Sequence, residues 1–273
     1  DEPVTTPDQW GVTKLLDLSG AAPNSRKQPI TAAASVGTDK TFGQQANYNY
    51  WIYFGTGRFF DPDDKTDIEQ QSYFGIKEPM VLATYPLSGE SKLKLTWDEV
   101  EMSGVPTNAR GDKGLMKVDE IMVYESLRAA DAQLACRDNA TGLPLTGDYS
   151  CMADFTVSSA DAYFDKLEKY IAGTGTCTGS DYTDNNYKNN CVDGWYLDFW
   201  PYENRERNVG QATLLGGLVT FTTYQPFSDV CKAEGNAYLY GVYYRTGTAW
   251  YENIFGAEGI TAGTVESKLD LGK

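Results

Sequence analysis

Five carboxylates stand close together in one short stretch of the sequence, "DPDDKTDIEQ" at residues 61–70. Calcium takes about six to eight oxygen ligands, and clustered carboxylates with nearby carbonyls can provide them. The EF-hand pattern is absent, because no glycine follows at the sixth position and no glutamate at the twelfth. The stretch therefore has two interpretations: a solvated acidic turn, or a weak calcium site whose ligands are Asp61, Asp63, Asp67 and Glu69.

A second short motif is the tripeptide Arg110-Gly111-Asp112, which integrins read. Its setting, "PTNARGDKG", is polar and contains glycine, so an exposed loop is expected. A motif of three residues also occurs by chance. The two interpretations are therefore an adhesion motif and a chance occurrence.

Five cysteines offer covalent chemistry, at Cys136, Cys151, Cys177, Cys191 and Cys231. The first four bracket two loops rich in Gly, Asn, Asp and Thr. Bridging each pair would close a loop of about 15 residues, worth roughly 3 kcal/mol in the chain-entropy account. We therefore predict the local pairs Cys136–Cys151 and Cys177–Cys191, formed in an oxidising compartment, with Cys231 unpaired or bonded outside the chain. Five reduced thiols are the alternative.

The residue types and motifs of several common catalytic and cofactor-binding sites are absent from the sequence. The chain contains no histidine, which removes the Ser-His-Asp triad, the His-ligated zinc site and the commonest general base. CxxC, Walker and GxGxxG motifs are absent as well. We therefore expect a protein that is not an enzyme.

Net charge and hydropathy argue against nucleic acid binding, against binding to an anionic membrane surface and against a membrane span. The net charge of −15 argues against nucleic acid and against an anionic membrane surface, because both are bound through Lys and Arg. No stretch approaches the roughly 18 continuous apolar residues of a membrane span. We expect neither nucleic acid binding nor a membrane span.

The elements that must position these residues are mostly strands. The segments "PITAAASVG", "YWIYFGTG" and "QSYFGIKEP" are β-like and bounded by turn residues, which predicts a three-stranded meander. "MVLATYPL" and "SKLKLTW" predict a hairpin around Ser88-Gly89-Glu90. "GWYLDF" predicts a short strand, "ATLLGGLVTFTTYQP" a hairpin turning at Gly216-Gly217, and "NAYLYGVYYRTGTAW" the last strand.

The region between these strand clusters differs in character. "SSADAYFDKLEKYIAG" predicts a helix, with a serine cap, apolar residues at helical spacing and a final glycine. We divide the chain into a first β segment at 1–96, a partly helical insertion with the cysteine loops at 97–190, and a second β segment at 191–273. The insertion is expected to make the partner contacts; covering a blade edge is the alternative.

Two antiparallel clusters of about four strands are typical of propeller blades. The unbroken run "YWIYF" favours a strand covered on both faces, as an inner blade strand is. The fold is therefore predicted as mainly β: a partial β-propeller of about two blades with a disulfide-bearing insertion. Phe59, Phe60, Tyr73 and Phe74 are expected to pack between blades, with a carbohydrate platform as the alternative. Glu206 and Arg207 are expected to form a buried or half-buried pair that fixes a blade turn.

Six motifs in order resemble the C-terminal β-propeller region of the PilY-type family, the type IV pilus biogenesis factors and tip-associated adhesins. They are "QPITAAASVG", "YWIYFGTGRFF", "QSYFGI", "GWYLDF" with Glu206-Arg207, "GGLVTFTTYQPFSDVC" and "AYLYGVYYRTG". The resemblance covers about residues 10–95 and 190–250. The chain departs from the family in lacking the upstream "DxDxDG" calcium loop, so the family's metal site carries over to no residue here. Asn204-Arg205 also stands where the family has glycine before Glu-Arg.

The resemblance implies a cell-surface or extracellular pilus-associated protein, acting in pilus assembly and in adhesion at the pilus tip. Its partners would be pilin or minor pilin subunits, or a host or surface receptor. The chain is expected to be a fragment of a longer protein. The alternative is a structural subunit or cap of an extracellular filament, self-associating through the exposed strand edges of an incomplete propeller.

Overall fold

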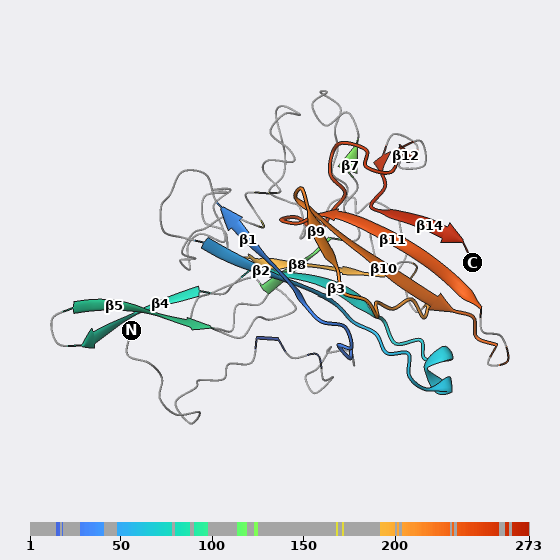
Figure 1. Ribbon diagram of the computed structural model, residues 1–273, viewed down its shortest axis with the longest axis horizontal. Coiled ribbons are helices and arrows are strands. Elements are labelled where there is room, and N and C mark those ends of the chain that lie inside the picture. Colours follow the sequence, from blue (N-terminus) through green and yellow to red (C-terminus); the bar gives the residue numbers. More distant parts are fainter. Residues whose placement is uncertain are drawn as a thin grey trace, which may run out of the picture.

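We describe the protein from a computed structural model (Figure 1). The structure describes residues 15, 16, 18, 28–40, 48–77, 80–87, 90–97, 114–118, 123–124, 168, 171, 192–199, 201, 204–229, 231, 234–256, 260–261 and 264–272. The described strands form two large β-sheets and two smaller ones, and few of the described residues are helical. The predicted mainly β fold is confirmed, while its arrangement as propeller blades stays a prediction.

The first sheet contains β1 (Ser35–Lys40), β2 (Tyr48–Gly55), β3 (Ser72–Lys77), β6 (Gly114–Lys117) and β8 (Val192–Asp198). Its strand order is β1-β2-β3-β8-β6. The first three strands are antiparallel neighbours in chain order, so the predicted meander is confirmed. β8 pairs antiparallel with β3, and β6 pairs parallel with β8. The first sheet thus combines strands from all three predicted segments of the chain.

The second sheet contains β9 (Thr213–Leu215), β10 (Leu218–Pro226), β11 (Gly235–Tyr243) and β14 (Lys268–Gly272). All neighbours are antiparallel, in the order β14-β11-β10-β9. β9 and β10 are joined by Gly216 and Gly217, whose φ angles are 61° and 86°. Two positive φ angles suit glycine and match the strand twist, so the predicted two-residue hairpin is confirmed.

Two smaller sheets complete the described strands. β4 (Met80–Leu87) and β5 (Glu90–Trp97) form the predicted hairpin, which lies to the side of the large sheets in Figure 1. β7 (Val123–Tyr124), β12 (Ile260–Thr261) and β13 (Thr264–Val265) form a short antiparallel sheet in the order β12-β13-β7.

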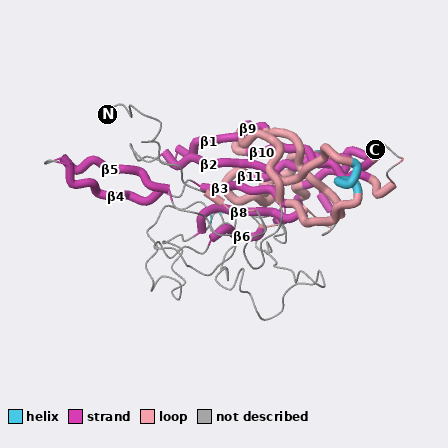
Figure 2. The backbone as a smooth tube through the Cα atoms, turned by 90° about the horizontal axis from the view of Figure 1, so that it is seen from below, coloured by secondary structure: helices cyan, strands magenta, loops and turns pink. Residues whose placement is uncertain are grey.

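Figure 2 shows the strands of the two large sheets lying close together, and aromatic side chains from both sheets pack between them. Tyr73 of β3 stacks on Phe221 of β10 with 3.6 Å between ring centroids. Trp195 of β8 is fully buried, and its indole lies against Gly247 in the turn after β11. A Cβ at Gly247 would come within 2.3 Å of that ring, and its φ of +70° also favours glycine. The sequence thus leaves space where the largest side chain of the core must fit.

The opposite face of the first sheet is covered as well. Phe54, Phe74, Ile76 and Leu115 are buried there, and Leu15, Leu16 and Leu18 pack against this cluster. β2 therefore places Trp51 and Tyr53 in the core between the sheets and Phe54 under the residue 15–18 segment. The unbroken apolar run of β2 follows from cover on both faces, and among the described residues the second cover is the residue 15–18 segment.

The segment 97–190 contributes to both cores. Its described residues include β6 and β7, together with Glu168 and Ile171, which are helical as predicted for that stretch. Leu115, Val118, Val123 and Ile171 are all buried. The segment is therefore part of the packed body over these residues. Among the described residues, no helix is long and apolar enough to cross a membrane.

Candidate functional site

The acidic stretch forms a compact turn in the loop between β2 and β3. Pro62–Lys65 is a 3-10 helix, named η2, which begins after the N-cap residue Asp61. The Asp61 carboxylate accepts a hydrogen bond from the Asp63 N–H at 3.0 Å. In return, the Asp61 N–H donates to the Asp64 carboxylate at 2.9 Å. Asp followed by Pro and, three residues on, by an acidic residue is a helix-start pattern, and this signal in the sequence was missed.

Asp64 lies at the centre of this turn and is only 1% exposed. Its carboxylate accepts hydrogen bonds from the backbone N–H of Phe60 and Asp61 and from the Arg58 guanidinium, each at 2.8–2.9 Å. Burial opposes ionisation, but these hydrogen bonds and the charge of Arg58 hold the pKa of Asp64 below its usual value. Asp64, which was not among the predicted calcium ligands, thus fixes the shape of the loop.

Arg207 braces the same loop from the second half of the chain. Its buried guanidinium donates to the carbonyl of Arg58 at 2.7 Å and to that of Asp67 at 3.1 Å. Its Nε also donates to the carbonyl of Arg205, at 2.9 Å. Burial lowers the pKa of Arg207 from its ordinary value, while nearby Asp67 and Asp64 oppose that shift. Both ends of the acidic loop are thereby tied to residues 205–207.

The braced loop presents apolar side chains to solvent. Phe60 is 80% exposed and Ile68 is 51% exposed, although the backbone around both is held by Asp64 and Arg207. The other predicted aromatics differ: Tyr73 and Phe74 are buried in the cores, and Phe59 packs edge-on against Tyr224 with 5.4 Å between centroids. Of the four, Phe60 alone is positioned for contact with a partner.

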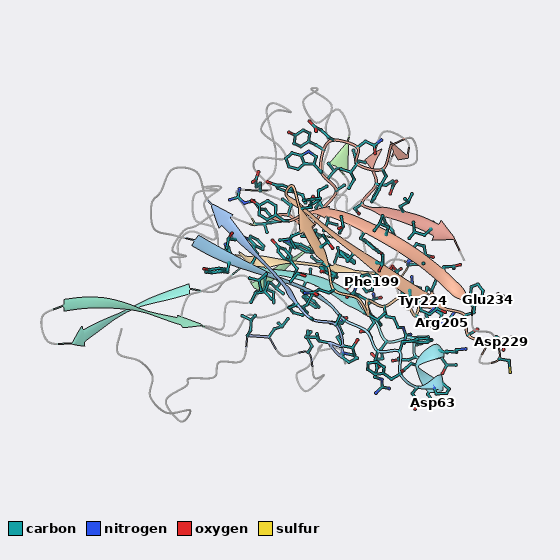
Figure 3. The ribbon with its side chains drawn as sticks, viewed as in Figure 1. Asp63, Phe199, Arg205, Tyr224, Asp229 and Glu234 are labelled. Atoms are coloured by element: carbon teal, nitrogen blue, oxygen red, sulfur yellow. The ribbon has the colours of Figure 1, made fainter. Side chains whose placement is uncertain are left out.

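Further loops meet at this end of the sheets. Figure 3 shows Asp63, Arg205, Tyr224, Asp229 and Glu234 together at the end where η2 lies, with Phe199 deeper between the sheets. Asp63, Asp229 and Glu234 are exposed. We call this surface the η2 end; it comprises the described residues of 56–71, 204–208 and 226–235. It combines a rigid turn, an exposed phenylalanine and several carboxylates.

The predicted calcium ligands do not converge on one point. Asp61 and Asp67 each use a carboxylate oxygen to accept a nearby backbone N–H, from Asp63 and Glu69 respectively. Among the described residues, no group of three or more Cys, Asp or Glu side chains is arranged to hold a metal ion. Two guanidinium groups, of Arg58 and Arg207, also contribute positive charge to the loop. Weak calcium binding by this loop stays a prediction.

We expect calcium to bind this loop weakly, with a dissociation constant of about 10⁻⁴–10⁻³ M, the range of extracellular calcium-binding modules, or higher. Titration calorimetry with calcium chloride measures this directly. Asp63→Asn should remove the heat, because Asp63 is exposed and its carboxylate accepts none of the capping hydrogen bonds described above. Absence of heat from the parent protein would end the calcium interpretation.

Replacing Asp64 by asparagine is expected to lower the free energy of unfolding near neutral pH by about 1–3 kcal/mol, because buried donors lose a charged acceptor. The folded-state pKa of Asp64 is depressed, so its contribution is present above the unfolded value of about 3.9 and is lost as pH falls through the folded value. Urea unfolding of parent and variant should therefore converge in acid. Asp63→Asn, at an exposed site, is the control; an equal difference at every pH would contradict this role.

Glu206 and Arg207 are both buried, as predicted, but they do not pair with each other. Glu206 forms a salt bridge with Lys268 at 2.6 Å. It also accepts hydrogen bonds from the hydroxyls of Thr223 at 2.5 Å and Tyr240 at 2.8 Å. Successive residues point to opposite sides of an extended chain, so Glu206 enters the second sheet while Arg207 reaches the acidic loop. The predicted Glu206–Arg207 pair is therefore wrong. Glu206 contacts the second sheet, and Arg207 contacts the acidic loop.

The helical residues of the 97–190 segment are anchored to the second sheet. Glu168 accepts a hydrogen bond from the Tyr243 hydroxyl at 2.9 Å and pairs with Arg245. Burial and the charge of Glu168 raise the pKa of Tyr243. These contacts place Glu168 against β11 and the turn after it, and Ile171 is buried in the core between the large sheets.

Several predicted site residues lie outside the described residues. They are Arg110, Gly111 and Asp112 of the adhesion motif, and Cys136, Cys151, Cys177 and Cys191 of the predicted disulfides. Cys231 is described; it is exposed and forms no disulfide. The motif and both bridges stay predictions.

No family model matches the chain, and no curated protein matches it. Among solved structures, the crystal structure of the Pseudomonas aeruginosa PilY1 C-terminal domain is similar to the chain, with 17% sequence identity and a TM-score of 0.43. The match covers 94% of this chain and 42% of that chain. The protein thus spans less than half the length of that chain.

Proposed function

We propose that this is a non-enzymatic protein of the type IV pilus system, located at the cell surface or outside the cell. It acts in pilus assembly and in adhesion at the pilus tip, with pilin or minor pilin subunits, or a surface receptor, as its partners. The observation that supports this proposal is the ordered series of six motifs that resemble PilY-type sequences. Their described residues include residues of β2, β3, β8, β10 and β11, which are five of the nine strands in the two packed sheets.

The η2 end is the surface that we assign to the partner contact. Preorganised loops on a rigid scaffold bind with a smaller loss of conformational entropy than mobile ones. Asp64 and Arg207 hold this loop, and Phe60 is the exposed aromatic that an apolar pocket of a partner would receive. The exposed carboxylates of Asp63 and Asp229 favour a partner surface with basic residues around that pocket.

Deletion of the gene in the source organism, followed by complementation, tests this function. We expect the deletion to reduce surface pili or adhesion, and the parent gene to restore both. Phe60→Asp should restore less than the parent does, whereas Leu215→Asp should restore fully, since Leu215 is exposed on β9 beside the start of β10 and the η2 end lies at the other end of β10. Normal piliation and adhesion in the deletion strain would contradict the proposal.

The filament alternative has one observation in its favour. β1 and β9 are edge strands of the two sheets, and they carry the exposed side chains of Val36 and Leu215. An uncovered strand edge can pair with another chain. A filament subunit would form open-ended assemblies in solution, whereas the tip-associated protein would not.

A further inference from the structure

A cluster at the start of β14 brings together an amine, a carboxylate and a carboxamide. Lys268 is the first residue of β14, and its Nζ donates to Oε2 of Glu206 at 2.6 Å. The amide nitrogen Nδ2 of Asn204 donates to the same oxygen at 3.2 Å. One carboxylate oxygen therefore holds a lysine amine and an asparagine amide side by side, although the two come from distant parts of the chain.

The carboxamide of Asn204 is fixed in position and polarised. Its oxygen Oδ1 accepts a hydrogen bond from the backbone N–H of Glu206 at 2.8 Å. The main-chain carbonyl of Asn204 accepts another from the Gln225 amide at 2.9 Å. An N–H group aimed at a carbonyl oxygen stabilises the negative charge that develops there when a nucleophile attacks the carbon. The side-chain carbon of Asn204 is thus prepared for attack.

The amine of Lys268 lies in a largely buried, aromatic setting. Its Nζ is 4.0 Å from the ring centroid of Tyr238 and 5.3 Å from that of Tyr240. Burial lowers the pKa of Lys268 from its ordinary value, although the charge of Glu206 opposes this shift. At a given pH, more of this amine is therefore neutral than of an exposed lysine, and the neutral amine is the nucleophile.

We propose that Lys268 and Asn204 form an intramolecular isopeptide bond, with Glu206 as the carrier of protons. Glu206 takes a proton from Nζ, whose lone pair then bonds to the side-chain carbonyl carbon of Asn204. Glu206 passes that proton to Nδ2, and the bond between the carbon and Nδ2 breaks. The departing ammonia takes the proton that Nζ must still lose. A lysine ammonium and a carboxamide thus become a secondary amide and an ammonium ion, without an oxidant or reductant.

The bond would tie an edge strand to a distant loop. β14 lies at one end of the second sheet, beside β11 (Figure 1), whereas Asn204 lies between β8 and β9. Once the bond forms, its N–H replaces the ammonium group as a donor near Glu206. A covalent link at this place prevents β14 from separating from the sheet and restricts the unfolded chain. This inference does not depend on the proposed function.

Mass spectrometry of the full chain, folded and then reduced and denatured, tests the bond. We expect the parent to be lighter than its residues require by one ammonia molecule. Trypsin should release residues 189–205 joined to residues 246–273, since an acylated Lys268 is not cleaved. Lys268→Arg and Glu206→Gln should each show their full mass. Lys65→Arg, outside the cluster, is the matched control and should keep the loss of ammonia.

Asn204→Asp supplies a readout that a merely structural role would not give. Its carboxyl group can form the same bond with Lys268, so this variant should lose one water molecule in place of one ammonia. The bond is ruled out by a folded parent of full mass, by a loss of ammonia without the joined peptides, or by a loss that persists in Lys268→Arg. Should Glu206→Gln misfold, the changed loss in Asn204→Asp still decides the question.

Discussion

Replacing Glu206 by alanine is expected to lower the free energy of unfolding by about 3 kcal/mol, near the lower limit for removing one partner of a buried ion pair. Glu206 is 1% exposed, and it accepts hydrogen bonds from Lys268, Thr223 and Tyr240. Removing it takes a buried charged acceptor away from the Thr223 and Tyr240 hydroxyls and the Lys268 ammonium group. The lower limit applies because 23% of the Lys268 side chain remains exposed to solvent, which compensates part of the lost interaction.

Urea unfolding of purified protein measures this effect. Glu206→Gln keeps the size and one acceptor oxygen, so it should lose less stability than the alanine variant. Glu252→Ala, at an exposed glutamate, should change stability by no more than about 0.5 kcal/mol. An equally small change for Glu206→Ala would show that the network does not hold β14 to the second sheet.

Ile171→Ala is expected to lower the free energy of unfolding by about 2–5 kcal/mol, through lost burial and the cavity that remains. Ile171 has no exposed surface and belongs to the core cluster between the large sheets, although it comes from the 97–190 segment. Ile171→Val should cost only about 0.5–1.5 kcal/mol, because it removes a single methylene. Ile68→Ala, at a half-exposed isoleucine of the η2 end, is the comparison from outside the core.

Chemical denaturation of these variants decides how the 97–190 segment is attached. Unchanged stability of Ile171→Ala would contradict our conclusion that the 97–190 segment is packed into the cores of the two sheets. It would favour instead an insertion attached to the surface. With the placement as described, replacing residues 100–188 by a short linker would remove Leu115, Val118, Val123 and Ile171 from the cores. That deletion is therefore expected to unfold the protein. For this reason it cannot be used to test whether the 97–190 segment contacts a partner.

The elements that were predicted correctly are those whose conformation depends on residues adjacent in the sequence. The hairpin at Gly216-Gly217 follows from two residues that tolerate positive φ, and β2 from an unbroken run of β-favouring side chains. The cover of β2 was predicted only in part. Periodicity shows that both faces are buried, but it does not say whether a sheet or the residue 15–18 segment covers them.

The candidate site was harder to predict because its contacts are long-range. Lys268 lies 62 residues from Glu206, and the carbonyl of Arg58 lies 149 residues from its donor Arg207. Adjacent opposite charges favoured a pair between Glu206 and Arg207, but the extended backbone directs the two side chains apart. Clustered carboxylates at 61–69 were interpreted as a solvated acidic turn or a weak calcium site, and neither interpretation included the capping bonds and the two arginines that shape the loop.

The assignment to the pilus system is tested most directly by locating the native protein. Immunogold electron microscopy of intact cells, with antibodies raised against the purified chain, gives its position relative to the pili, and the gene-deletion strain supplies the background. We predict gold at pilus tips or at the sites from which pili emerge. Gold confined to the cell interior, or spread over the surface with no relation to pili, would contradict the proposed function.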